Sequence, residues 1–104
     1  MPTIIRRKSD NVVTNFAQSA NFDDGHLTFT KIGGGDVIAP RKTSDTHEII
    51  DDVTLPTKYH GGMLTYDDGT WTILTDVLAQ HNANLKAIRD HRGTTDPEDI
   101  EVEL

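Results

Sequence analysis

The chain has 104 residues, 35% of them hydrophobic, and a formal net charge of −7. This length gives room for one small domain, and the negative charge argues against general binding to the phosphate backbone of nucleic acids. The absence of cysteine excludes disulfide bonds, thiol catalysis and zinc–thiolate sites. No stretch reaches the roughly 18 apolar residues of a membrane span, so we expect no membrane insertion.

The first third of the chain alternates short β-type runs with turn residues. Residues 3–7 and 12–16 flank a polar segment, 8–11, whose Asp and Asn accept turn conformations, and this pattern predicts a β-hairpin. A second turn at residues 23–25 precedes residues 26–32, where side chains alternate with the period of two that is typical of a strand.

The middle of the chain continues this pattern. Three glycines from Gly33 end the previous strand, and residues 37–39 could begin another before Pro40. We expect a polar loop at residues 41–45, followed by short strands at 47–50 and 53–55.

The clearest hairpin joins residues 63–66 to residues 70–73. Between them stands Asp67-Asp68-Gly69, whose Asp-Gly pair suits a tight turn that needs positive φ angles. Fourteen threonines in the chain, many of them in these runs, also favour strands over helix.

A helix is predicted over residues 76–92. Thr75 is a candidate N-cap, and Asp76 lies at the positive end of the helix dipole. Basic residues gather in the last turns, and Gly93 stands where a left-handed residue usually ends a helix.

Mainly apolar positions recur along this helix with heptad-like spacing. The predicted seam consists of Leu74, Leu78, His81, Leu85 and Ile88. One interpretation lays this seam across the β-sheet. The alternative is a short bundle with copies of the chain or with a fibre protein, in which His81 would be a polar element that sets the register.

The last residues form a candidate C-terminal arm, residues 94–104. From Asp99 onward acids alternate with Ile100, Val102 and Leu104, so an extended arm would carry its three apolar side chains on one face. Such a segment could add to the edge of a sheet in its own chain or in a neighbour's; the alternative is a frayed tail.

Charge is unevenly distributed along the chain. Residues 93–104 carry five acids and no base, whereas Arg6, Arg7 and Lys8 make the N-terminal region locally basic. Acidic arm and basic start could pair between copies in an assembly; the alternative is that both are simply solvated.

The sequence gives no pattern typical of catalysis or of cofactor and metal binding. The five histidines match no metal-ligand motif, and the three glycines at 33–35 lack the Gly-Lys-Ser/Thr of a phosphate loop. We therefore expect no enzyme, no cofactor and no metal. Tyr66 and Trp71 are expected to anchor the last hairpin in the core, on the helix or at a subunit interface; contact with carbohydrate is the alternative.

Two stretches resemble small proteins encoded in the tail modules of tailed bacteriophages. The first is Ile4-Ile5-Arg6-Arg7-Lys8-Ser9-Asp10-Asn11-Val12-Val13, a strand, a turn and a second strand. The second combines Leu55-Pro56 with the run from Tyr59 to Trp71, after which a helix usually begins in such proteins. The resemblance implies a non-enzymatic virion component near the tail fibre or baseplate, with no catalytic residues. In that family the helix often extends further, whereas here Gly93 interrupts it.

These observations together predict a mainly β protein, a small sandwich or open barrel of short antiparallel strands, with one C-terminal helix and an extended acidic arm. The expected divisions are 1–74 for the β part, 75–93 for the helix and 94–104 for the arm. The expected function is to join tail fibre or baseplate proteins in a virion, after synthesis in the host cytoplasm. Partners would be other virion proteins and copies of the chain. A capsid decoration protein and a small acidic inhibitor are the alternatives.

Overall fold

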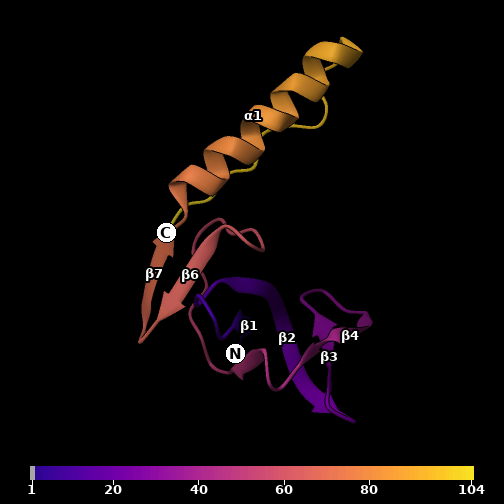
Figure 1. Ribbon diagram of the computed structural model, residues 1–104, viewed down its shortest axis with the longest axis vertical. Coiled ribbons are helices and arrows are strands. Elements are labelled where there is room, and N and C mark those ends of the chain that lie inside the picture. Colours follow the sequence, from indigo (N-terminus) through magenta and orange to yellow (C-terminus); the bar gives the residue numbers. More distant parts are fainter. Residues whose placement is uncertain (1) are drawn as a thin grey trace.

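The computed structural model describes residues 2–104, which form seven strands and one helix. The strands are β1 (Thr3–Arg7), β2 (Val13–Asp23), β3 (His26–Lys31), β4 (Asp36–Thr43), β5 (His47–Ile50), β6 (Leu64–Asp67) and β7 (Thr70–Ile73). Five of them form an antiparallel sheet in the order β4–β3–β2–β1–β5, and β6 and β7 form a separate hairpin (Figure 1). The predicted fold class is confirmed: the chain is mainly β with a single C-terminal helix, and its described residues form no closed barrel.

The predicted turns join the strands as expected. Asn11 ends the β1–β2 turn with a φ of 62°, and Asp68 and Gly69 have φ angles of 47° and 82° in the β6–β7 turn. Positive φ angles suit these residue types, because Asn and Asp tolerate the left-handed region and Gly adopts it without steric cost.

Both faces of the sheet contribute to the core. Ile4 and Ile5 are adjacent in β1 and both are fully buried, because successive side chains of a strand point to opposite faces. The two core clusters are Ile4, Val13 and Val53 on one side, and Ile5, Ala17 and Leu27 on the other. Register shifts in the pairings of β1, β2 and β3 mark irregularities that bend a sheet, and the curvature of β2 is visible in Figure 1.

The β6–β7 hairpin is fastened to the start of β2. An isolated bridge joins Val12 to Thr65, and the Tyr66 amide donates to the Asn11 carbonyl at 3.1 Å. The Arg6 guanidinium adds a hydrogen bond to the Tyr66 carbonyl at 2.7 Å.

Three predicted segments differ from the structure: two strands and one loop. Residues 53–55 form no strand, although Val53 is buried and its amide donates to the Pro2 carbonyl at 3.0 Å. The predicted loop at 41–45 begins only after Thr43, because β4 continues through Pro40, which is tolerated in an edge strand. The second strand extends beyond residue 16 to Asp23, because it continues to pair with β3.

The helix α1 spans Thr75–Arg92. Gly93 follows it in the left-handed conformation with a φ of 67°, and its amide donates to the Arg89 carbonyl, as the predicted helix stop requires. The predicted N-cap was wrong: Leu74 occupies the capping position, with no side-chain capping bond, and Thr75 is already helical.

Candidate interaction site on the helix and the C-terminal arm

The helix projects away from both sheets instead of lying across one (Figure 1). None of its 18 residues is buried. The interpretation in which the predicted seam packs on the β-sheet was therefore wrong, and the seam contributes no side chain to the sheet core.

What lies against the helix is the chain's own C-terminal arm, which runs back along it (Figure 1). The Asn82 side chain donates to the Ile100 carbonyl at 3.1 Å and accepts from the Ile100 amide at 2.8 Å. One turn before the helix ends, the Arg89 guanidinium donates to the Pro97 carbonyl and to the Asp99 carboxylate, both at 2.8 Å. The arm therefore runs antiparallel to the helix, held by side-chain hydrogen bonds.

A second attachment lies beside the β6–β7 hairpin. Lys58 and Glu103 exchange two backbone hydrogen bonds of 2.9 Å, which form an isolated antiparallel bridge. The Lys58 ammonium also pairs with the Glu101 carboxylate, and this hydrogen bond raises the pKa of Lys58 above its ordinary value. The arm thus makes one β-bridge within its own chain but forms no strand.

The arm covers some residues of the predicted helical seam and leaves others exposed. Leu78 and Leu85 are half-buried, and they share one face of the helix with the arm-binding Asn82 and Arg89. His81 and Ile88 lie outside this face and are exposed. Leu74, which the seam also included, is half-buried just before the helix.

The apolar residues of the arm differ in exposure. Ile100 and Val102 are half-buried, whereas Leu104 is 58% exposed. Leu104 lines a groove beside the hairpin together with Leu55 and Trp71.

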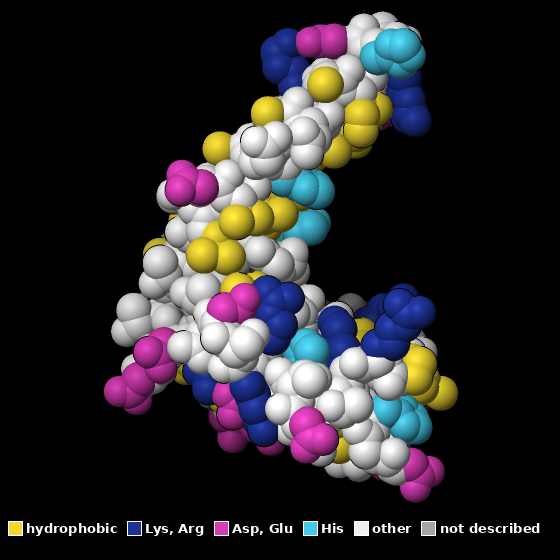
Figure 2. All heavy atoms as spheres, in the orientation of Figure 1, with side chains coloured by type: hydrophobic (Ala, Val, Ile, Leu, Met, Phe, Trp, Pro, Cys, Tyr) yellow, Lys and Arg dark blue, Asp and Glu magenta, His cyan; other side chains and the backbone are white. Residues whose placement is uncertain are grey.

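An exposed stripe remains next to the arm, consisting of Val77, His81, Asn84 and Ile88. Val77 is 46% and Ile88 39% exposed, and both are large apolar side chains. In Figure 2, yellow hydrophobic side chains lie along both edges of the helix, and cyan histidine side chains lie on the side that faces the rest of the molecule. The nine residues 77–85 include no Asp, Glu, Lys or Arg, which is unusual for a helix surrounded by water.

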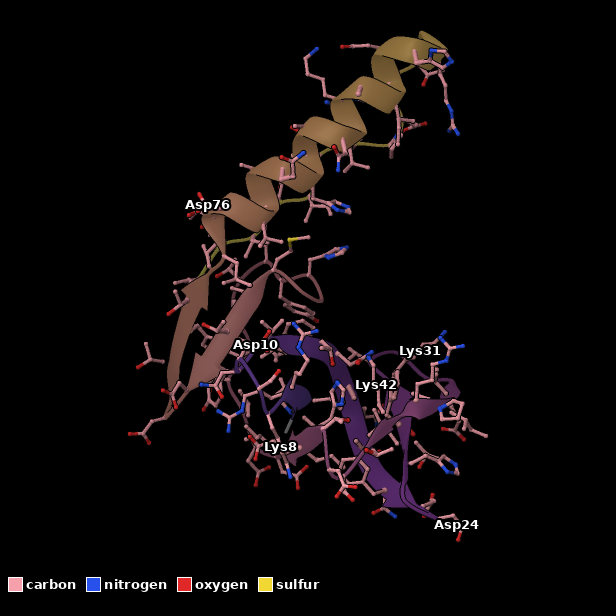
Figure 3. All side chains as sticks on the ribbon, viewed as in Figure 1. Lys8, Asp10, Asp24, Lys31, Lys42 and Asp76 are labelled. Carbon is pink, nitrogen blue, oxygen red and sulfur yellow. The ribbon has the colours of Figure 1, made fainter. Side chains whose placement is uncertain are left out.

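The ends of the helix carry opposite charges. Asp76 projects from the first turn (Figure 3), and the last turn holds Arg89, His91 and Arg92 together with Asp90, which pairs with Lys86. The arm uses Arg89, whereas the described residues provide no ion-pair partner for Asp76 or Arg92. Because Asp90 and Asp99 neutralise Lys86 and Arg89, the charges of the helix itself that stay unpaired within residues 2–104 are Asp76 near its start and Arg92 at its end.

Tyr66 and Trp71 pack on the sheet core and not on the helix. Both lie against the cluster around Ile4, and their ring centroids are 4.8 Å apart. The Trp71 indole donates to the Thr54 carbonyl at 3.1 Å, and its ring stacks at 6.1 Å on Phe16. Trp71 therefore fixes the hairpin against the sheet, and the expectation that it would lock the hairpin onto the helix was wrong.

The basic start of the chain is paired within the β part. Arg6 pairs with Glu48, and Arg7 with Asp10 at 2.6 Å. Lys8 donates to the Ser44 carbonyl at 2.7 Å and lies far from the helix in Figure 3. Within one chain, the acidic arm and the basic start do not pair; the arm uses Lys58 and Arg89 instead.

Three residues of this site were missed by sequence reasoning: Lys58, Asn82 and Arg89. Asn82 and Arg89 are seven residues apart, and therefore on one face of the helix. The sequence did contain a signal for them. Leu78 and Leu85 lie on the same helix face as Asn82 and Arg89, and these four residues together form the face that the arm covers.

Within residues 2–104, no three His, Asp or Glu side chains are grouped as a metal ion would require. The same residues include no helix with the length and apolar composition needed to cross a bilayer. Comparison with protein-family models, curated proteins and solved structures found no match.

Proposed function

We propose that this chain is a non-enzymatic structural protein of a tailed-phage virion, where it joins tail fibre or baseplate components. The observation that carries the proposal is the projecting helix, which has no buried residue and, in the part of the chain that the structure describes, is contacted mainly by the arm and by His60, whose ring centroid lies 6.4 Å from that of His81. The resemblance of residues 4–13 and 55–71 to tail-module proteins supports the virion context.

The physical argument rests on the stability of such a helix. Most of the stability of a helix in a protein comes from the packing of one of its faces, and not from the helix propensity of its residues. Here the arm covers one face, and the exposed stripe still offers Val77 and Ile88 to solvent. Because charged residues are depleted at the centres of protein interfaces, the uncharged segment 77–85 is typical of a surface that a partner protein covers.

The proposal is tested on purified phage particles whose genome encodes this chain. Heads and tails are separated, and the chain is quantified in each fraction by mass spectrometry. Recovery with the tails supports the proposal. Recovery with the heads would favour a capsid decoration protein, and absence from particles would favour a small soluble inhibitor; either result would overturn the proposed tail role.

A truncation tests the role of the arm in the same particles. Removing residues 96–104 takes away the contacts of Ile100 and Glu103 and exposes Leu78 and Leu85. We expect incorporation to fall. Unchanged incorporation would show that the arm is dispensable for assembly.

A further inference from the structure

We infer that the exposed stripe is covered by the same stripe of a second copy, with the two helices antiparallel around a twofold axis. This inference rests on the proposed function, since it names one partner of the helix that the assembly role requires. Three features of the helix support it: the spacing of the stripe, its symmetry and the charge polarity.

The stripe has the spacing of a helix–helix contact. Val77, His81, Asn84 and Ile88 follow one another at intervals of four, three and four residues, which keeps them within one narrow arc of a helix. The arm lies beside this arc, on the face of Asn82 and Arg89. Within the arc, His81 has the His60 ring beside it, with 6.4 Å between the ring centroids, and all four stripe residues stay exposed.

The stripe is also self-complementary when one helix is reversed. Val77 and Ile88 are equally far from the point between Asn82 and Ala83, and so are His81 and Asn84. An antiparallel pair centred there places Val77 against Ile88 of the other copy, which buries the two large exposed apolar side chains of each helix. His81 then faces Asn84, and an imidazole and an amide can share a hydrogen bond.

Charge selects the antiparallel arrangement over the parallel one. Each helix has Asp76 in its first turn and His91 and Arg92 in its last turn. Reversing one helix brings the unpaired Asp76 of each copy toward the unpaired Arg92 of the other and opposes the two helix dipoles. A parallel pair would instead bring Asp76 to Asp76 and Arg92 to Arg92, and would align the two helix dipoles.

Cysteine cross-linking tests this arrangement, because the natural chain contains no cysteine. Chains carrying Val77→Cys are mixed with tagged chains carrying Ile88→Cys under mild oxidation, and we expect disulfide-linked pairs of one chain of each kind. Each variant alone should stay uncrosslinked, since residues 77 of two antiparallel helices lie about 16 Å apart along the axis, beyond the reach of a disulfide.

The control pair is Ala79→Cys mixed with Lys86→Cys. These two positions are placed with the same symmetry about the helix centre but on the opposite face, so they should give no cross-link. Cross-linking of Val77→Cys with itself would indicate a parallel arrangement, and equal cross-linking of the control pair would indicate random collision. Either result would overturn the inference.

Sedimentation equilibrium supplies an independent measurement on the full chain. The natural protein should associate to a dimer, and Val77→Asp should weaken this association about tenfold or more, because it would bury an unpaired charge. Ala79→Asp should leave it nearly unchanged, and far-UV circular dichroism checks that both variants keep the helix. A chain that stays monomeric at all concentrations but enters phage tails would refute only the dimer. A dimer that is absent from particles would refute only the proposed function.

Discussion

Replacing Asn82 by alanine tests how the C-terminal arm is held on the helix. The Asn82 side chain makes two hydrogen bonds to the backbone of Ile100, one through its amide nitrogen and one through its oxygen. A hydrogen bond in a protein contributes about 0.5–1.5 kcal/mol net, so the two together stabilise the docked arm by about 1–3 kcal/mol. Alanine cannot replace either bond.

Amide hydrogen exchange measures this loss directly. The Ile100 amide is protected by Asn82, and the Glu103 amide by the Lys58 carbonyl. A loss of about 1–3 kcal/mol corresponds to exchange that is faster by about 5- to 150-fold. We expect this acceleration at Ile100, and a smaller acceleration at Glu103 because the arm is fastened there independently.

The matched control is Asn84→Ala. Asn84 is exposed on the same helix and bonds to Gln80, not to the arm. Both substitutions raise helix propensity by a similar amount, so a difference between them reports the contacts of Asn82. If Asn82→Ala and Asn84→Ala gave the same exchange rate at Ile100, the reasoning about the arm would be refuted.

Three further predictions concern the β part. Ile4 is fully buried, so Ile4→Ala should lower the free energy of unfolding by about 2–5 kcal/mol, whereas Ile38→Ala, at a side chain 67% exposed, should change it by about 0.5 kcal/mol or less in urea titrations. A Cβ atom on Gly61 would lie 2.5 Å from the carbonyl oxygen of Thr14, so Gly61→Ala should cost about 1–3 kcal/mol in the same assay. Burial lowers the pKa of His47 below 6.5, so the unfolded chain binds a proton more readily, and the free energy of unfolding should fall as the pH drops below about 6.5. His47→Gln should remove this part of the pH dependence. A His47 that titrates at or above 6.5 by NMR would contradict this prediction.

The succession of strands and turns along the chain could be predicted, because it depends on the residues of each turn. The turns at Asn11, at Asp24 and at Gly69 need positive φ angles, and the sequence offers Asn, Asp and Gly there. The first and last residues of each strand were harder to predict, because a strand continues only as long as a neighbouring strand pairs with it. Pro40 predicts the end of a strand, but it lies in an edge strand, where the missing amide breaks no interior ladder.

The direction in which the helix points could not be predicted, for a different reason. The period of its apolar residues shows which side chains share a face, but not which surface covers that face. Leu78 and Leu85 would have the same pattern if they packed on the sheet, on the arm or on another chain. In the structure the arm takes that face, and the choice depends on Asn82 and Arg89, two polar residues that a search for apolar periodicity passes over.

The position of the arm could not be predicted either, because a strand-like pattern does not show what the segment will pair with. Its alternation of acids and aliphatic residues correctly suggested an extended backbone, but a helix offers no free backbone ladder to such a segment, because its own amides and carbonyls are bonded within it. Side chains must therefore supply the hydrogen bonds, as Asn82 does for Ile100. Only beyond the start of the helix, where Lys58 has a free amide and carbonyl, does the arm make a β-bridge. The arm is thus extended along its length but paired at a single residue, Glu103, because that is where an unpaired backbone lies within its reach.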